Sequence, residues 1–142
     1  AVEEELMHAA DVAQAGDFIR SLPDGLQSHV AQGGTNFSGG QKQWLSIARA
    51  LVKRPELYIF DDSFSALDFK TDAALRRALA AETKDAAVLI IAQRVSSIRH
   101  ADQIVVLHEG HMAGIGTHEE LMRTCRVYQE IYESQTKEAE VS

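Results

Sequence analysis

Apolar residues recur along this chain at two spacings, one typical of helices and the other of buried strands. Helical spacing is found over 2–15, in the run that follows Ser38, and over about 69–81. Continuous apolar runs cover Leu57–Phe60 and Ala87–Ala92, and the second is of the kind that is buried on both faces of a sheet. Strands that alternate with helices predict an α/β fold with a largely parallel sheet.

The last third of the chain predicts a small antiparallel unit. A short helix is expected over 95–100, before a strand over Gln103–Leu107. A tight turn at Glu109-Gly110 would join that strand to a partner over His111–Gly116. The parallel sheet is therefore expected to be followed by a β-hairpin.

Two residue pairs predict where helices begin. Ser38 with Gln41, and Thr117 with Glu120, have the three-residue spacing of a capping box. In this arrangement each side chain satisfies a backbone N–H group of the other residue at the start of a helix. A final helix is expected from about Cys125, with one apolar stripe formed by Val127, Tyr128, Ile131 and Tyr132.

Candidate chemistry gathers in the stretch 36–68. An extended, polar segment over 26–34 leads into Ser38-Gly39-Gly40-Gln41. Adjacent glycines expose backbone N–H groups at the start of a helix, where the helix dipole favours an anion. These four residues predict contact with a phosphate group, and a plain helix cap is the alternative interpretation.

The strand Leu57–Phe60 ends in two carboxylates, Asp61 and Asp62. Acidic side chains at the end of a buried strand lie at the edge of a sheet, where oxygen ligands can hold a divalent cation. They predict a metal site, and a strand-end cap is the alternative for Asp61. Asp68 precedes a predicted helix, so N-capping is one interpretation of its role and a place in the nucleotide site is another.

Composition narrows the classes of function. The 142 residues, 45% of them hydrophobic, suffice for one domain with a core or for a piece of one. A formal net charge of -7 argues against binding along a nucleic-acid backbone, which requires a basic face. Cys125 is the single cysteine, which excludes an internal disulfide and suits a reducing compartment. No apolar run approaches the roughly 20 residues that span a bilayer, so a soluble chain is expected.

Four motifs, in order, resemble the nucleotide-binding domains of ABC transporters. Phe37-Ser38-Gly39-Gly40-Gln41-Lys42-Gln43 resembles their signature motif, and Leu57–Asp62 resembles their Walker B strand. Ser65-Ala66-Leu67-Asp68 resembles their D-loop, and Ile91-Ala92-Gln93-Arg94 resembles their switch region. The tail over 104–121 resembles exporter-type domains in particular.

The resemblance implies a partial P-loop NTPase core of the RecA-like type, with ATP and Mg²⁺ as ligands. Residues 1–54 would form the helical subdomain that carries the signature motif. Residues 55–142 would form the C-terminal part of the ATPase core, with its hairpin and last helices. No Gly-x-x-x-x-Gly-Lys-Ser/Thr sequence, the family's Walker A loop, occurs in the chain. That loop and the Q-loop lie upstream in the family, so the chain resembles the C-terminal part of such a domain and is expected to be inactive by itself.

Two positions depart from the family's pattern. Asp62 stands where the family has a glutamate general base, and its side chain is shorter by one methylene. Gln93 stands where the family has the switch histidine. A glutamine amide can hydrogen-bond a γ-phosphate, but it can neither change charge near neutral pH nor relay a proton. Together the departures resemble the degenerate half of a heterodimeric exporter.

In the family two domains meet head to tail, and the signature motif of one completes the ATP site of the other. By resemblance, Ser38-Gly39-Gly40-Gln41 would contact ATP held by a second nucleotide-binding domain, and Asp68 is counted with these nucleotide-binding residues. Asp61 would hold Mg²⁺, usually through water. Asp62 and Gln93 would serve this domain's own, weaker site. The other expected partner is the transmembrane domain of the transporter, at the cytoplasmic face of the cell membrane.

Two other functions stay open at this stage. The chain by itself could be a non-catalytic binding or assembly fragment, because an incomplete sheet exposes edges that favour association. It could also belong to a soluble ABC ATPase of DNA repair or translation. The exporter-like tail and the acidic charge favour the transporter.

Overall fold

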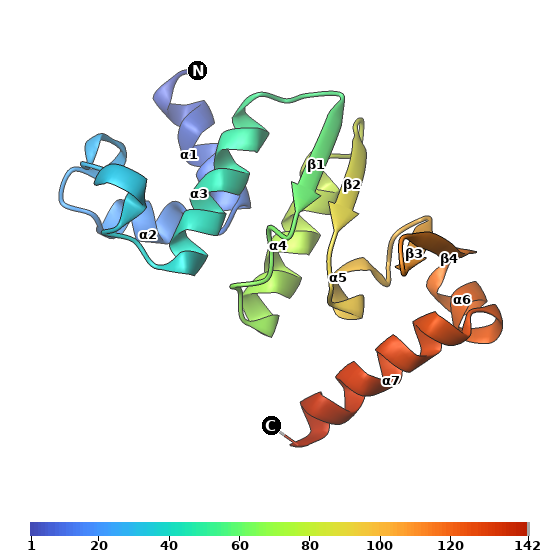
Figure 1. Cartoon of the computed structure of the whole chain (residues 1–142). Coiled ribbons are helices and arrows are strands. Elements are labelled where there is room, and N and C mark those ends of the chain that lie inside the picture. Colours follow the sequence, from blue (N-terminus) through green and yellow to red (C-terminus); the bar gives the residue numbers. More distant parts are fainter. Residues whose placement is uncertain (142) are drawn as a thin grey trace. The chain divides into compact units, whose positions relative to one another are not determined.

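The computed structural model describes residues 1–141, with the side chains of 1–137 (Figure 1). The chain forms two compact units, one over Ala1–Ile91 and a second that begins at Ala92. This division is based on which residues contact one another within the chain. The boundary expected after residue 54 instead separates two subdomains of the family, and it stays a prediction.

Helices make up most of the first unit. Where the sequence suggests an extended segment over 26–34, the chain forms a 3₁₀ turn at each end of it, and the backbone is extended at Ser28 and Ala31 between the turns, so that prediction is right only for the middle of the segment. The Asn36 side chain closes this loop, since it accepts from the Ala31 N–H at 3.1 Å and donates to the His29 carbonyl at 3.1 Å. The helical elements of the first unit are α1 (Glu3–Val12), α2 (Gly16–Ser21), η1 (Gly25–Gln27), η2 (Gln32–Gly34), α3 (Gly39–Val52) and α4 (Phe69–Glu82).

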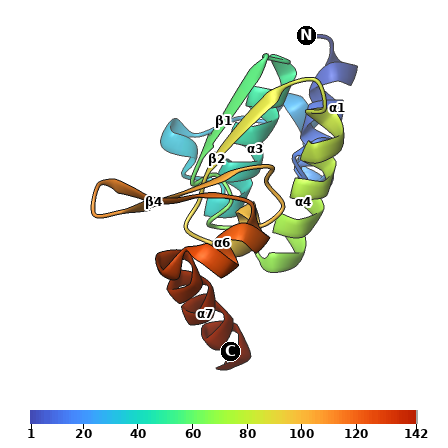
Figure 2. The same cartoon turned by 90° about the vertical axis from the view of Figure 1, so that its right-hand side faces the viewer.

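Two parallel strands form the sheet of the first unit, as the sequence predicts. β1 (Leu57–Asp61) pairs in register with β2 (Ala87–Ile91). Helices α1, α3 and α4 lie on one face of this sheet (Figure 2). Tyr58 and Phe60 point to that face and are buried at 4% and 3% exposure, because they pack against apolar residues of all three helices.

The opposite face of the β1–β2 sheet is open. Leu57 and Ile59 of β1 are 51% and 59% exposed, and Leu89 and Ile91 of β2 are 51% and 49% exposed. The prediction that Ala87–Ala92 is buried on both faces is therefore wrong for this chain. Its apolar composition was read correctly, but within the described residues β2 pairs only with β1 and helices cover one face.

Over its described residues, 92–141, the second unit combines the predicted hairpin with three helices. β3 (Ile104–His108) and β4 (His111–Gly116) pair antiparallel, with a register shift between Val106 and Leu107. The helices are α5 (Val95–Ile98), α6 (His118–Thr124) and α7 (Arg126–Val141).

The core of the second unit lies between the hairpin and its helices. The predicted box at Thr117 and Glu120 is confirmed, because each side chain bonds the other residue's N–H, at 3.3 and 2.8 Å. Cys125 is buried at 5% exposure and its thiol packs in this core. The predicted stripe of α7 is also confirmed, since it joins the same cluster through Val127, Tyr128, Ile131 and Tyr132.

Candidate functional site

Helix α3 begins with the capping box that the sequence predicts. The Ser38 hydroxyl accepts from the Gln41 N–H at 3.2 Å, and the Gln41 side chain accepts from the Ser38 N–H at 2.9 Å. The Lys42 N–H donates to the Ser38 carbonyl. The N–H groups of Gly39 and Gly40 are thus the first-turn donors that these contacts leave for a ligand.

Neither glycine of this first turn is required by packing within the chain. Apart from its chain neighbours and the backbone of its own helix, the nearest atom to a Cβ at Gly39 would lie 3.8 Å away, and the nearest to a Cβ at Gly40 would lie 3.6 Å away. Both distances are ordinary van der Waals contacts, so alanine would fit at either position. The absence of a side chain at these two positions is therefore not required by any contact inside the chain.

The two adjacent carboxylates lie at the C-terminal end of β1. Asp61 is the last residue of the strand, and both Asp61 and Asp62 are exposed. Asp62 adopts a left-handed conformation, with φ at 49°. Its N–H donates to the carbonyl of Ile91 at 2.9 Å, so the end of β2 fixes its backbone.

Asp68 caps helix α4. Its carboxylate accepts from the Thr71 hydroxyl at 2.7 Å and from the Thr71 N–H at 2.9 Å. These hydrogen bonds, the one from the hydroxyl first, hold the pKa of Asp68 below its ordinary value. The capping interpretation is thus borne out, and a nucleotide contact by the same side chain stays a prediction.

Gln43 is a residue whose role the sequence pattern missed. The hydrophobic pattern places it away from the apolar side of α3, with no assigned contact. In the structure its side-chain amide bridges α3 to the loop after β1, with hydrogen bonds to Asp62, Ser65 and Ala66. No periodicity signal could have found this bridge, since the loop and the helix are joined only in the fold.

Gln93 belongs to the second unit, whereas the other predicted site residues belong to the first. Its side chain is exposed, and its carbonyl accepts from the Gln135 side chain at 2.7 Å. The other end of the Gln135 amide accepts from the Val95 N–H at 2.9 Å. Helix α7 thereby fixes the backbone on which Gln93 is presented.

The donor set for a metal ion is small. Within the described part of the chain, no group of three or more His, Cys, Asp or Glu side chains could hold a metal. Mg²⁺ keeps several waters and needs only one or two carboxylates when phosphates supply further oxygens. The exposed Asp61 and Asp62 fit a magnesium ion of that kind, and do not fit an ion held by protein ligands alone.

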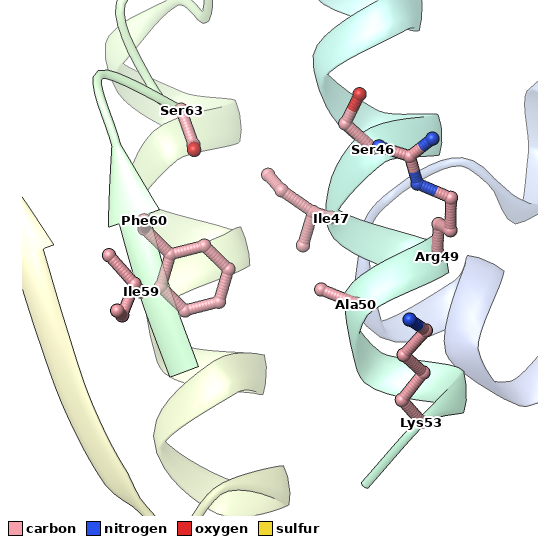
Figure 3. A pocket seen from close by; sticks show the side chains of 8 residues that line it. All are labelled: Ser46, Ile47, Arg49, Ala50, Lys53, Ile59, Phe60 and Ser63. Carbon is pink, nitrogen blue, oxygen red and sulfur yellow. The ribbon is translucent and has the colours of Figure 1, made fainter. Parts of the chain in front are cut away.

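A cavity of about 490 Å³ opens between α3 and β1. Figure 3 shows Ile47 of α3 and Phe60 of β1 facing one another across it, with Arg49 and Lys53 farther along the helix. The cavity includes none of the predicted site residues. Its lining comprises Ser46, Ile47, Arg49, Ala50, Lys53, Ile59, Phe60 and Ser63.

Comparison with known proteins identifies the family. The sequence model of the ABC transporter family matches residues 2–65. An ABC transporter ATP-binding protein of Mycobacterium tuberculosis is 48% identical over 139 residues, which are 98% of this chain and 24% of that protein. The chain belongs to the ABC transporter family. The α/β fold and the family that the motifs predict are both confirmed.

Further similarities point to the exporters among ABC transporters. An ATP-binding/permease protein of Staphylococcus aureus, assigned to multidrug export, is 44% identical over 135 residues, or 95% of this chain and 23% of that protein. The structure of a bacterial Atm1-family ABC exporter with ATP bound superposes with a TM-score of 0.91 at 38% identity. The superposed region covers 96% of this chain and 24% of the exporter chain. This ABC transporter chain thus spans about a quarter of the length of the relatives it matches.

The length and the apolar character of the helices decide whether any of them could cross a membrane. Among the described residues, no helix combines the length and the apolar character needed to cross a bilayer. The S. aureus relative is named as an ATP-binding and permease protein, and the similarity covers 23% of it.

Proposed function

We propose that this chain is part of the ATP-binding domain of an ABC exporter, in which its signature motif acts on ATP held by a second nucleotide-binding domain. The observation that carries the proposal is the start of α3. There the capping box fixes Ser38 and Gln41, while two glycines that the fold does not need leave the backbone bare. A helix end built in this way offers N–H groups and a positive dipole to a phosphate group.

The carboxylate pair serves a second half-site in the same proposal. Asp61 would hold Mg²⁺, which would supply positive charge to neutralise the phosphates. Asp62 occupies the position of the general base, where its shorter side chain limits how well it orients water. Gln93 donates a hydrogen bond toward a γ-phosphate, but it cannot take up a proton. The chain thus supports ATP hydrolysis poorly at its own site, while its signature motif is intact and completes the site of its partner.

Gly40→Ala in the intact transporter tests the role of the signature motif. Alanine fits in the chain and favours a helix, so the thermal stability of the protein should be unchanged or slightly raised. The added methyl group blocks close approach by phosphate, and ATP hydrolysis should fall about a hundredfold. Melting temperature and steady-state hydrolysis are the two measurements.

Gly25→Ala is the matched control. Gly25 has a φ of 50° and lies in open space, so alanine is strained there without touching any neighbour. This variant should lose stability and keep its hydrolysis rate per folded molecule. The proposal fails if Gly40→Ala hydrolyses ATP at the unmodified rate.

A further inference from the structure

The side chain of Gln43 forms a fork between helix α3 and the loop after β1. Its Nε2 atom donates to the Asp62 carbonyl at 3.3 Å and to the Ser65 hydroxyl at 3.2 Å. Its Oε1 atom accepts from the Ala66 N–H at 3.0 Å. Both the nitrogen and the oxygen of the Gln43 amide are thus hydrogen-bonded, and all three partners lie in the same loop.

The loop that Gln43 holds contains a residue in an unfavourable backbone conformation. Asp62 has a φ of 49°, a region that residues other than glycine enter only when surrounding contacts fix them. Three groups fix it here. The Ile91 carbonyl accepts from its N–H, and its own carbonyl accepts from Gln43 and from the Ser65 hydroxyl at 3.2 Å.

Among these three contacts with Asp62, the one from Gln43 comes from outside the sheet and the loop. The Ile91 bond belongs to the end of the β1–β2 sheet, and Ser65 lies in the same loop as Asp62. Gln43 lies on α3, two residues after Gln41 of the capping box. Because a helix is stiff over two residues, the start of α3 and the backbone of Asp62 must keep a fixed separation.

We infer that Gln43 is a positioning residue, which holds Asp62 in its left-handed conformation and so aims the Asp62 carboxylate. The inference rests on the proposed function, in which Asp62 occupies the position of the general base. It adds a residue that acts through Asp62 and links the signature helix to the carboxylate loop of the same domain. Loss of its amide would release the loop from α3, although β1 and α3 would stay folded.

Gln43→Met in the intact transporter tests this role, since methionine keeps the length of the side chain without its hydrogen bonds. Hydrogen exchange followed by mass spectrometry should show faster exchange in peptides that cover 62–66, and unchanged exchange over β3 and β4. Gln43→Glu keeps the acceptor for the Ala66 N–H and loses the donors, so it should give an intermediate rate. Unchanged exchange at 62–66 in Gln43→Met would overturn the inference whether or not the transporter hydrolyses ATP.

A kinetic test asks whether Gln43 acts through Asp62. In a transporter that carries Asp62→Glu, adding Gln43→Met should lower kcat for ATP about tenfold and change KM less than about twofold, as for a misplaced group. In the Asp62→Asn protein the same change should have an effect below about twofold, because the group that it positions is gone. Equal losses in both backgrounds would assign Gln43 a role that does not depend on Asp62, and would refute the inference.

Gln129→Met serves as the control for both measurements. Gln129 also donates from its side-chain amide to a backbone carbonyl, that of Met122 at 2.7 Å, but it lies on α7 in the second unit. This variant should leave the exchange over 62–66 and kcat unchanged. If no variant hydrolyses ATP, the proposed function fails, and the exchange measurement still decides whether Gln43 holds the loop.

Discussion

At the scale of single residues, the backbone of Asp62 is fixed more firmly than its side chain. The left-handed conformation costs about 1 kcal/mol for a residue other than glycine, and contacts from β2, α3 and its own loop offset it. The carboxylate itself is exposed. Its reach is therefore set by the length of the side chain, which is one methylene shorter than that of glutamate.

Asp62→Glu combined with Gln93→His should restore hydrolysis at this chain's own site in the intact transporter. Glutamate brings the carboxylate closer to an attacking water, and a displacement of about 1 Å is worth up to about a hundredfold in rate. Histidine adds a group that can exchange a proton near neutral pH. We expect a rise of at least about tenfold in single-turnover ATP hydrolysis. Asp102→Glu, at an exposed aspartate of the second unit, is the control and should cause no rise. An unchanged rate in the double variant would show that these two residues do not limit the site.

At the scale of elements, close packing of β4 on α6 organises the second unit. A Cβ atom at Gly114 would lie 2.9 Å from the Cys125 sulfur and 3.1 Å from a methyl carbon of Leu121. Leu121 and Cys125 are buried at 1% and 5% exposure, so they have little room to move. Glycine at this strand position is therefore required by the approach of the helix, in contrast to the glycines at the start of α3.

Gly114→Ala should destabilise the second unit by about 1–3 kcal/mol, because overpacking displaces buried neighbours. Chemical denaturation, followed by a probe placed in the hairpin, would measure the change in the free energy of unfolding. Met112→Ala, on the same strand and 61% exposed in the native protein, should change it by less than about 0.5 kcal/mol. Equal effects of the two substitutions would contradict the packing argument.

At the scale of the whole molecule, the first unit has a covered and an uncovered sheet face. Ile59 and Leu89 are directly opposite one another in the register, and both are about half exposed on the uncovered face. Parallel sheets are normally covered on both faces, and contiguous apolar surface of this kind favours association. This supports the expectation that the isolated chain associates with itself or with a partner.

Replacing both Ile59 and Leu89 by lysine should weaken self-association of the isolated chain. Two charges on the apolar face oppose its burial, and we expect the dissociation constant to rise at least about tenfold, or about 1.4 kcal/mol. Sedimentation velocity over a range of concentrations would measure it. Val30→Lys, at a single exposed valine in a loop, is the control and should leave the association unchanged. If the unmodified chain sediments as a monomer at all concentrations, the uncovered face does not drive association.

The order of the helices and strands followed from the sequence because local spacing and capping chemistry determine it. The box at Ser38 and Gln41 begins a helix as predicted, and the carboxylates at 61 and 62 follow a parallel strand as predicted. The 3₁₀ turns at the two ends of the segment over 26–34 were missed, because polar composition does not distinguish extended backbone from turns in a loop closed by a side chain such as Asn36.

The sequence by itself determined the family, the order of its motifs and the residue types of the candidate site, since these depend on neighbours along the chain. Only the tertiary structure decided that Asp62 is left-handed, that Gln43 ties it to α3, and that the glycines at 39 and 40 are not needed for packing. Each of these facts depends on atoms brought together from segments that are distant in the sequence. Neither hydrophobic periodicity nor a sequence motif predicts such contacts, because a hydrogen bond between a helix and a loop exists only after both have folded.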